Sequence, residues 1–395
     1  MITQLVEKWQ PLLENDKVSK ISDPYRSRVT AQLLENQEKF LAEAAQTTTG
    51  NIQNWDPVLI NLVRRLAPKL IAYDVCGVQP MTGPTGLVFA MRSRYTNGAG
   101  AEAFFDEADT AHAGAASPVH AGDDPWDVTF TTGVGKATAD GEVDAWNSMS
   151  MTIEKTSVTA KTKQLRADYS LELAQDLRAI HGLDAENELS NILSTEIISE
   201  INREVVRTIY AISKAGAQFA STPGTFDLAN DADGRWFLER VKGLLFAIER
   251  DANKIAKETR RGKGNLIITT ADVASALAMA GVLNYAPALQ SQISIPEVDE
   301  TGVTYVGTVG RFKVFIDPYL GTDGYVIGYK GANAYDAGIF YCPYVPLPMV
   351  RATSVDTFHP AIGFKTRYGM IANPFTSLSA NSNIYYRKAK ILNLL

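Results

Sequence analysis

The chain has few cysteines and no long apolar run, and each lack excludes a class of protein. Its two cysteines, Cys76 and Cys342, lie far apart and form no C-x-x-C pair. A disulfide scaffold and a cysteine-type zinc site are therefore not expected. No stretch approaches the roughly eighteen consecutive apolar residues of a membrane-spanning helix. Glu7 and Lys8 stand where a secretory signal carries its apolar core, so no signal peptide is expected.

Positive charge and the common catalytic motifs are also in short supply. The 395 residues include 38 Lys and Arg against 44 Asp and Glu, and the net charge of −6 gives no general attraction to nucleic acid. The sequence has no G-x-x-x-x-G-K-[ST], G-x-S-x-G or H-E-x-x-H motif. We therefore expect no enzyme, no cofactor and no metal site. The length permits two or three ordinary domains.

Two weaker patterns point toward enzymes or metal proteins. Residues Gly98 to Ala103, Gly-Ala-Gly-Ala-Glu-Ala, fit the G-x-G-x-x-A of a dinucleotide loop, although no βαβ unit surrounds them. An α/β nucleotide-binding enzyme therefore stays as the alternative from a different class. His112 and His120 lie in an acidic loop without the spacing of a zinc motif, so a solvated loop is the simpler interpretation.

The strongest pattern is one long amphipathic helix over residues 184–212. Its apolar residues recur every three or four positions and form a single stripe. They are Leu189, Ile192, Leu193, Ile197, Ile201, Val205, Ile209 and Ile212. Asp184 is the expected N-cap, and Glu186 and Glu188 fall in the first turn, where the helix dipole favours negative charge. A helix of roughly 43 Å is expected to be the backbone on which other elements pack.

The helix faces beside that stripe are charged. Glu196, Glu200 and Glu204 follow one another at intervals of four, with Arg203 and Arg207 within reach. Carboxylates spaced in this way bind metals in helix bundles only when facing helices supply Glu-x-x-His, and the sequence has none. A solvated or subunit-facing surface is the better interpretation. These five residues are therefore the candidate contacts between subunits.

The chain before this helix is expected to be helical at first and then extended. Residues 1–43 contain amphipathic helical stretches that could not bury their apolar faces alone, so we expect them to dock on another surface. A polar linker at residues 44–54 and a short helix at 57–67 follow. Residues 96–127 are expected to form a long loop, and residues 128–151 an exposed ribbon that needs an external partner.

The chain after the helix alternates helical and strand patterns. Residues 236–257 and 272–280 are expected to be helices, and short apolar runs near 266–269, 303–309, 312–316 and 324–329 to be strands. Residues 217–345 therefore indicate a compact α/β domain. Strand-like patterning returns at residues 349–371.

One long run resembles a known family. It reads Lys161-Thr-Lys-Gln-Leu-Arg-Ala-Asp-Tyr-Ser-Leu-Glu-Leu-Ala-Gln-Asp-Leu-Arg-Ala-Ile-His-Gly-Leu-Asp-Ala-Glu-Asn-Glu-Leu189, followed by Glu200-Ile-Asn-Arg-Glu-Val205. These residues resemble the major capsid protein of myovirus-type tailed phages. Gly83-Pro-Thr-Gly-Leu-Val-Phe-Ala90 and the helix after Trp236 support the resemblance, which extends from about Trp55 to the C-terminus.

The resemblance implies an α+β fold, the tailed-phage and herpesvirus capsid fold, with the long helix as its spine. It implies an N-terminal arm at residues 44–84 and an extended E-loop ribbon at 85–160. A peripheral domain would comprise residues 161–216 and 346–395, and an axial domain residues 217–345. Family members often carry a folded insertion in the E-loop region. Here the loop-like residues 96–127 occupy that place, so functions of such an insertion are not implied.

The resemblance also implies a life cycle. The chain would assemble as hexamers into an icosahedral shell in the host cytoplasm, reside in the virion, and meet vertex and portal proteins and packaged DNA. An internal scaffold would bind residues 1–43. A prohead protease that cuts after Leu-x-Glu would remove them between Glu43 and Ala44, although Leu33-Leu-Glu35 and Leu12-Leu-Glu14 also fit. A pentameric vertex protein of the same family is the near alternative.

Overall fold

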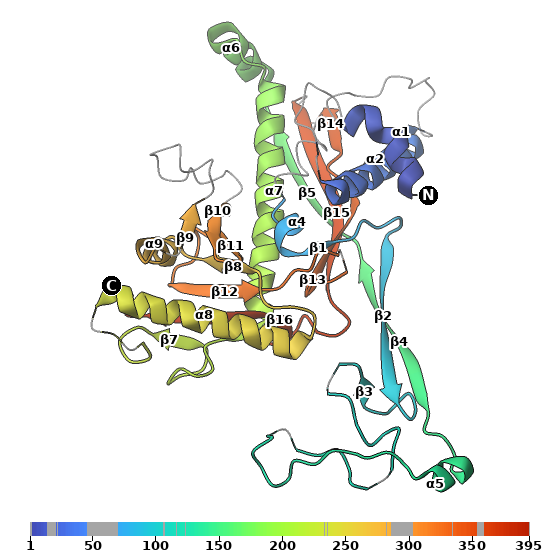
Figure 1. Cartoon of the computed structure of the whole chain (residues 1–395). Helices are drawn as coiled ribbons and strands as arrows, with labels where there is room; N and C mark the ends of the chain where they lie inside the picture. The colour runs from blue at the N-terminus through green and yellow to red at the C-terminus, as the bar shows by residue number, and fades with distance from the viewer. Residues whose placement is uncertain are drawn as a thin grey trace. The chain divides into compact units, whose positions relative to one another are not determined.

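The computed structural model describes residues 2–13, 21, 23–45, 70–105, 107–115, 117–122, 124–232, 234, 236–281, 283–285, 303–333, 335–353 and 359–394. They fall into two compact units (Figure 1). Unit 1 comprises residues 1–86 and 157–395, and unit 2 comprises residues 87–156. Helices and sheets are both present, so the predicted α+β class is confirmed.

Unit 1 is built around the predicted long helix, α7 (Ala185–Ile212). The Asp184 side chain caps it by accepting a hydrogen bond of 3.3 Å from the backbone N–H of Glu186. Its apolar stripe packs against strands β5 (Lys161–Asp168), β15 (Pro360–Ala372) and β16 (Asn383–Leu392). Ile192, which we assigned to the buried stripe, is instead 61% exposed, because it lies on the side of α7 opposite the buried Ser190 and Ser194.

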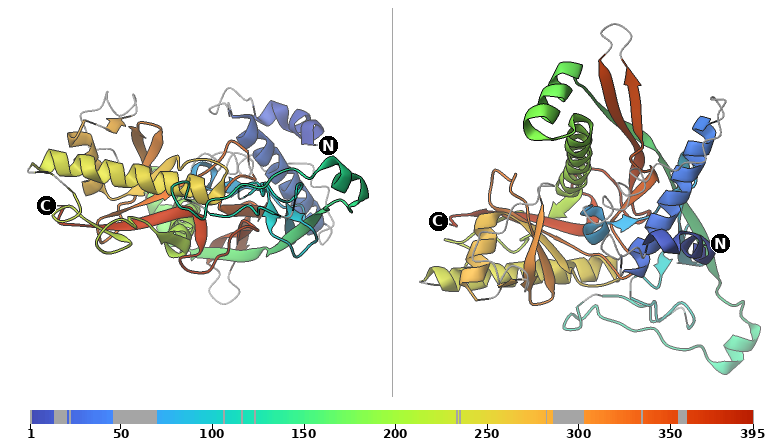
Figure 2. Two further views of the ribbon diagram at one scale, coloured as in Figure 1. Left: turned by 60° about the horizontal axis from the view of Figure 1, so that its bottom comes forward. Right: turned by 90° about the horizontal axis from the view of Figure 1, so that it is seen from above.

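One sheet of unit 1 combines segments from distant parts of the chain. Its order is β1-β13-β15-β14, and β5 also pairs with β15. The new strands are β1 (Gly77–Val78), β13 (Ile339–Val345) and β14 (Met349–Thr353). β5 and β15 are antiparallel from the pair Lys161 and Tyr368 to the pair Asp168 and Ala361, and Figure 2 shows them side by side. The returning tail therefore completes the sheet that α7 covers.

The other sheet of unit 1 has the order β6-β16-β12-β8-β11-β10-β9, and β7 also pairs with β16. These strands are β6 (Ser213–Ala215), β7 (Thr225–Asp227), β8 (Leu266–Thr269), β9 (Leu283–Tyr285), β10 (Thr304–Val309), β11 (Phe312–Ile316) and β12 (Gly324–Gly328). Helices α8 (Phe237–Thr259) and α9 (Ala271–Met279) pack on this sheet. The helices and strands predicted within residues 236–329 are therefore confirmed.

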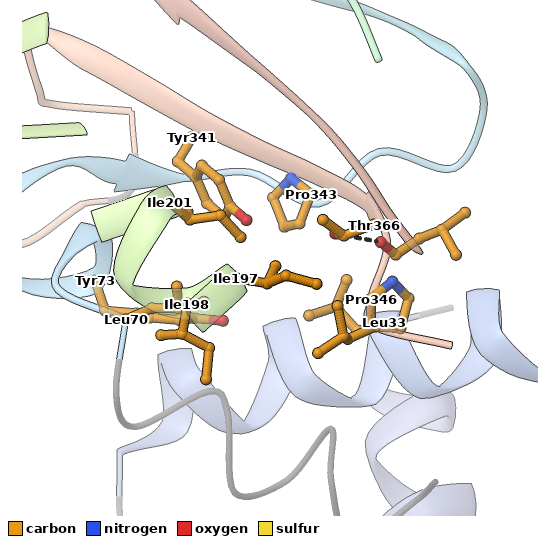
Figure 3. Close-up of a pocket in the computed structure, with 12 residues that line it drawn as sticks. Leu33, Leu70, Tyr73, Ile197, Ile198, Ile201, Tyr341, Pro343, Pro346 and Thr366 are labelled. Atoms are coloured by element: carbon orange, nitrogen blue, oxygen red, sulfur yellow. Dashed lines mark hydrogen bonds between the residues drawn. The ribbon is translucent and has the colours of Figure 1, made fainter. Parts of the chain in front are cut away.

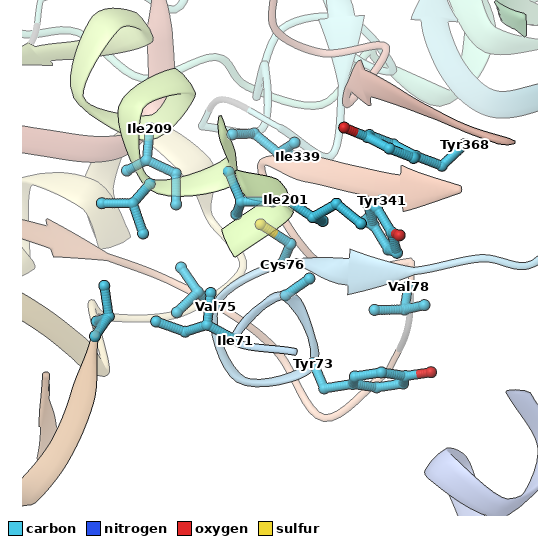
Figure 4. Packing of buried hydrophobic residues seen from close by; sticks show 14 of the residues in the cluster. Ile71, Tyr73, Val75, Cys76, Val78, Ile201, Ile209, Ile339, Tyr341 and Tyr368 are labelled. Carbon is cyan, nitrogen blue, oxygen red and sulfur yellow. The ribbon is translucent and has the colours of Figure 1, made fainter. Parts of the chain in front are cut away.

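The main core lies between α7 and the strands. Ile201 and Ile209 of α7 meet Ile339, Tyr341 and aromatic side chains of the last strands (Figure 4). The short helix α4 (Ala72–Val75) contributes buried side chains to the same core. A second cluster fills the space between α8, α9 and their sheet. Both cysteines, Cys76 and Cys342, are buried free thiols.

Unit 2 departs from the expected ribbon. Its sheet has the order β3-β2-β4, with strands β2 (Thr85–Tyr95), β3 (Glu102–Ala103) and β4 (Met149–Thr159). The ribbon expected at residues 128–151 is wrong, because residues 138–143 form a short exposed helix, α5 (Thr138–Val143), and β4 begins at Met149. The alternation of Thr, Gly and Val there offers no large apolar face that would fix a strand register.

The N-terminal helices are α1 (Ile2–Leu13) and α2 (Pro24–Ala45). Pro24 starts α2, where a proline costs no hydrogen bond, whereas Pro11 lies within α1. The polar linker that we predicted at residues 44–54 is wrong at its start, because Ala44 and Ala45 are helical. The rest of that linker and the helix predicted at 57–67 lie outside the described residues.

Candidate assembly surfaces

The charged side of α7 contains two kinds of residue. Glu196, Glu200 and Arg207 are exposed, whereas Arg203 and Glu204 are half-buried. Glu200 has a long contact of 3.7 Å to the Lys163 ammonium, and both side chains are substantially solvent-exposed. A pair of this kind contributes about 0–1 kcal/mol. Glu196, Glu200 and Arg207 therefore remain available to a partner.

The Glu204 side chain makes its contacts within its own chain. Its carboxylate accepts a hydrogen bond from the Tyr368 hydroxyl of β15 and lies 2.6 Å from the Lys163 ammonium of β5. Burial, together with the adjacent Glu204 carboxylate, raises the pKa of Tyr368 well above its ordinary value, so this hydroxyl stays a donor. Glu204 thus fastens α7 to the two strands it covers.

Arg203 also has an intrachain role that its spacing did not reveal. Its guanidinium donates to both carboxylate oxygens of Asp317, each at 2.7 Å. The Tyr210 hydroxyl donates to the same carboxylate at 2.8 Å, and the Asp317 side chain is fully buried. Burial and the Asp317 charge raise the pKa of Tyr210. Arg203 therefore joins α7 to the loop after β11 rather than pairing with Glu200.

A further surface lies on α6 (Leu171–His181), which precedes α7. The Ser170 side chain caps it by accepting from the Leu173 N–H at 3.2 Å, and Gly182 ends it with a φ of 67°. None of its residues is buried against the described chain. We define the α6 surface as five apolar side chains that are 44–74% exposed and lie on α6, in the turn after it and in the first turns of α7. They are Leu171, Leu173, Ile180, Leu183 and Ile192.

Unit 2 carries exposed aromatic residues on a strongly acidic segment. Residues 87–156 contain eleven Asp and Glu but four Lys and Arg. Arg92 already pairs with Glu102 at 3.2 Å and Glu154 at 3.1 Å within unit 2. Trp126 and Trp146 are 91% and 92% exposed. Such large exposed apolar side chains are typical of surfaces that a partner covers.

The glycines of the weak dinucleotide pattern serve a turn. Residues 98–101 connect β2 to the antiparallel β3, and no helix begins there. A Cβ on Gly100 would lie 1.8 Å from the carbonyl oxygen of Tyr95, so the turn requires glycine. The strand-to-helix geometry of a pyrophosphate site is therefore missing at this position, which removes the basis of the enzyme alternative.

The two histidines of unit 2 make ordinary contacts. His112 packs on the ring of Tyr95, and its Nε2 lies 3.2 Å from the carbonyl oxygen of Ser148. His120 Nδ1 lies 3.2 Å from the hydroxyl of Thr110. Within the residues that the structure describes, no group of three His, Cys, Asp or Glu side chains is arranged to hold a metal ion.

Helices α1 and α2 dock on their own chain. Val29 and Leu33 of α2 enter the main core, and the Asn36 amide donates to the carbonyl oxygens of Met81 and Tyr344 at 2.8 and 2.9 Å. Trp9 of α1 packs on the opposite side of α2. The surface on which residues 1–43 were expected to dock is therefore at least partly their own subunit.

A small cavity marks this docking site. It measures about 50 Å³ and lies between Leu33 of α2, Ile197 and Ile201 of α7, and Tyr341 and Pro343 of β13 (Figure 3). Its walls are largely apolar, so loss of α2 would expose them. The backbone of Glu43 and Ala44 lies in the last turn of α2.

A family model for the "Major capsid protein Gp23" matches residues 52–391 of this chain. The chain belongs to this family. The major capsid protein of Salmonella phage ViI is 40% identical over 439 residues, covering 100% of this chain and 99% of that protein. The major capsid protein of Enterobacteria phage T4 is 34% identical over 504 residues, covering 99% and 96%. The resemblance found in the sequence is confirmed, and the chain is a structural protein of the phage head shell.

Other comparisons are weaker. The capsid vertex protein of Enterobacteria phage T4 is 26% identical over 241 residues, which cover 57% of this chain and 53% of that protein. A solved structure of the capsid of Myoviridae phage XM1 aligns with a TM-score of 0.43 and 9% identity, covering 82% of this chain and 92% of that one. In the described part of the chain, no helix is long and apolar enough to span a membrane.

Sequence reasoning found the exposed acids of α7 but missed the α6 surface and the acidity of unit 2. The excess of acids over residues 87–156 could have been counted in the sequence. The exposure of α6 could not, because its Leu and Ile spacing resembles that of a helix that is buried in its own chain.

Proposed function

We propose that this capsid protein assembles as hexamers in an icosahedral shell through surfaces that its own chain leaves uncovered. The observation that carries the proposal is α6, whose eleven residues are all unburied although Leu171, Leu173 and Ile180 are apolar. A helix this short is marginal in water without packing. A neighbouring copy that covers the α6 surface would supply that packing. The exposed aromatic residues of unit 2 are proposed to contact a second neighbour.

The charged side of α7 is proposed as part of the same contact, with Glu196, Glu200 and Arg207 as its residues. Arg203 and Glu204, two of the five candidates from the sequence, are proposed to act indirectly, since their side chains already bind Asp317 and Tyr368. Glu200 and Glu204, two acids one turn apart on α7, can therefore be compared: the first is proposed to contact a neighbouring subunit and the second to stabilise its own.

Charge reversal at Glu200 and at Glu204 tests this comparison. Glu200→Lys should leave the melting temperature nearly unchanged while the protein fails to sediment as shells. Glu204→Lys should lower the melting temperature, because it breaks contacts with Tyr368 and Lys163. The matched control is Asp272→Lys, an exposed acid on α9 that belongs to none of the proposed contacts. Normal shells formed by the Glu200→Lys protein would exclude this face from the interface.

We further propose the domain roles that the resemblance implied. Residues 44–84 act as an N-terminal arm, 85–160 as the E-loop, 161–216 with 346–395 as the peripheral domain and 217–345 as the axial domain. Assembly takes place in the host cytoplasm with a scaffold and a prohead protease, and the shell meets vertex and portal proteins and packaged DNA. The full-length similarity to major capsid proteins, against partial similarity to a vertex protein, favours the hexamer role. Copy number per particle tests it.

Maturation by removal of residues 1–43 is proposed from the Leu-x-Glu pattern that ends at Glu43. The bond to Ala44 lies near the end of α2, where helices fray and a protease gains access. Intact-mass measurement of purified capsids should give a chain that begins at Ala44. Masses that correspond to cuts after Glu14 or Glu35 would assign a different site, and an uncut chain would refute maturation at the N-terminus.

A further inference from the structure

Helix α8 presents a strongly basic face to solvent. Lys242, Arg250, Lys254 and Lys257 are exposed along it, and Arg260 and Arg261 follow its last turn. From Lys242 to Lys257 the face extends about 22 Å. We call these six residues the α8 basic face (α8 is yellow in Figure 1).

Four acids lie on α8, and three of them do not neutralise this face. The fourth, Glu239, is exposed three residues before Lys242 and accepts a hydrogen bond of 3.5 Å from the Trp236 N–H. Glu249 and Glu258 pair with Lys263 and Arg387, which lie outside it. Asp251 is 3% exposed, and its carboxylate accepts hydrogen bonds from the Ala217 N–H and the Tyr325 hydroxyl. Within the described residues, no ion pair involves any member of the α8 basic face.

Such an arrangement costs helix stability. Arg250 and Lys254 are four residues apart on the helix, and like charges at this spacing destabilise a helix by about 0.2–0.5 kcal/mol. The helix dipole favours the last three cations, since they lie at the C-terminus. It does not account for Lys242, Arg250 and Lys254. These charges therefore indicate an external anion.

The shape beside the helix suits a chain of phosphates. A hollow of about 650 Å³ borders the face, and three of the six cations line it. Its lining residues are Gln218, Phe219, Arg250, Asp251, Asn253, Lys254, Ala256 and Lys257. The Arg250 guanidinium stacks over the Phe219 ring at 4.6 Å, which fixes it at the rim. Pockets of this volume accept groups of the size of a nucleotide.

We infer that the α8 basic face binds the phosphate backbone of nucleic acid without sequence preference. A protein partner is disfavoured, because the centre of a protein interface is depleted of charge and rich in aromatic anchors. Here cations occupy the centre, and Phe246 is the large apolar side chain exposed among them, at 64%. The inference rests on the proposed function in one respect, that the shell encloses DNA.

The test measures binding of the full chain, before assembly, to a fluorescent DNA duplex at several salt concentrations. The variant is Arg250→Gln with Lys254→Gln and Lys257→Gln, since glutamine preserves helix propensity. Each lost phosphate contact should reduce the slope of log K against log salt by about one, so the triple variant should lose about three. The control removes three exposed cations elsewhere, Lys161→Gln, Arg178→Gln and Lys365→Gln, and should keep the slope.

Three results would overturn the inference. They are a wild-type chain that does not bind the duplex, an equal loss of slope in the control, and a triple variant that loses binding to a polyglutamate peptide but not to DNA. The last result would assign the face to an acidic protein. Thermal melting checks folding of each variant. Electron microscopy of the wild-type chain distinguishes failure of this inference from failure of the proposed function. Shells formed by a chain that does not bind DNA refute the inference alone, whereas the absence of shells refutes the proposed function.

Discussion

The docking of α2 on its own subunit can be tested at Leu33. Its side chain is 6% exposed and lines the cavity against Ile197 and Tyr341. Truncation of a buried leucine to alanine lowers the free energy of unfolding by about 2–5 kcal/mol. The pre-existing cavity places Leu33→Ala at the lower end, near 2 kcal/mol, because the removed atoms already touch empty space. That is roughly a thirtyfold change in the ratio of docked to undocked helix.

Trp9 offers the signal for this measurement. Its indole is 4% exposed and packs between α1 and α2, whereas Trp126, Trp146 and Trp236 are at least 73% exposed. Two short helices without their docking surface are marginal in water, so undocking should let the pair come apart and expose Trp9. Urea titration of unassembled protein, followed by tryptophan emission, should show an earlier transition in Leu33→Ala. The exposed Lys39→Ala is the control on the same helix. An unchanged midpoint in Leu33→Ala would mean that residues 1–43 are stabilised by a surface other than this one, such as the scaffold implied by the resemblance.

Two further predictions concern buried polar groups. Arg203→Ala should lower the free energy of unfolding by about 3 kcal/mol, because it leaves the fully buried Asp317 carboxylate without its cation. Asp317→Ala should cost less, because the Arg203 side chain is 28% exposed and can reach water. In a double-mutant cycle the combined loss should fall short of the sum by about 0.5–3 kcal/mol, and strict additivity would refute the contact. Burial raises the pKa of Cys76 and Cys342 to about 12, so neither should react with a thiol reagent near pH 9 until the chain unfolds. Because the unfolded thiols ionise first, stability should decline as pH rises above their ordinary pKa of 9.0, and rapid labelling of the folded chain would contradict their burial.

The local sequence pattern predicted those helices and strands whose capping residues and apolar spacing lie within the element itself. α7 was found within one residue because a capping aspartate and a three-four apolar spacing both lie in the segment itself. β8 and β11 matched because each is a short run that is buried on the sheet. The ribbon at residues 128–151 failed because its few large apolar residues, such as Phe130 and Trp146, are too scattered to specify a register.

Contacts between distant segments lay beyond this kind of reasoning. Arg203 and Asp317 are 114 positions apart, and the helical spacing favoured a local partner, Glu200, that the structure does not use. Docking of α2 depends on Met81 and Tyr344, which flank it only after the sheet has formed. Two of the five candidates from α7, Arg203 and Glu204, therefore also serve the fold of the subunit.

The net charge of the chain shows most clearly how an average conceals a function. Unit 2 contributes four cations and eleven acids, which leaves 34 cations and 33 acids for the rest. The overall value of −6 is therefore largely a property of one extended segment. Electrostatic attraction is screened over about 10 Å at ordinary ionic strength, so a polyanion responds to the charge of the surface it meets rather than to the sum over the chain. Six cations on and after α8, none of them in an ion pair within the described residues, give this surface a positive potential. A mild general repulsion of nucleic acid and a local attraction to it are thus compatible in one subunit, provided that the acidic segment and the α8 basic face meet different partners.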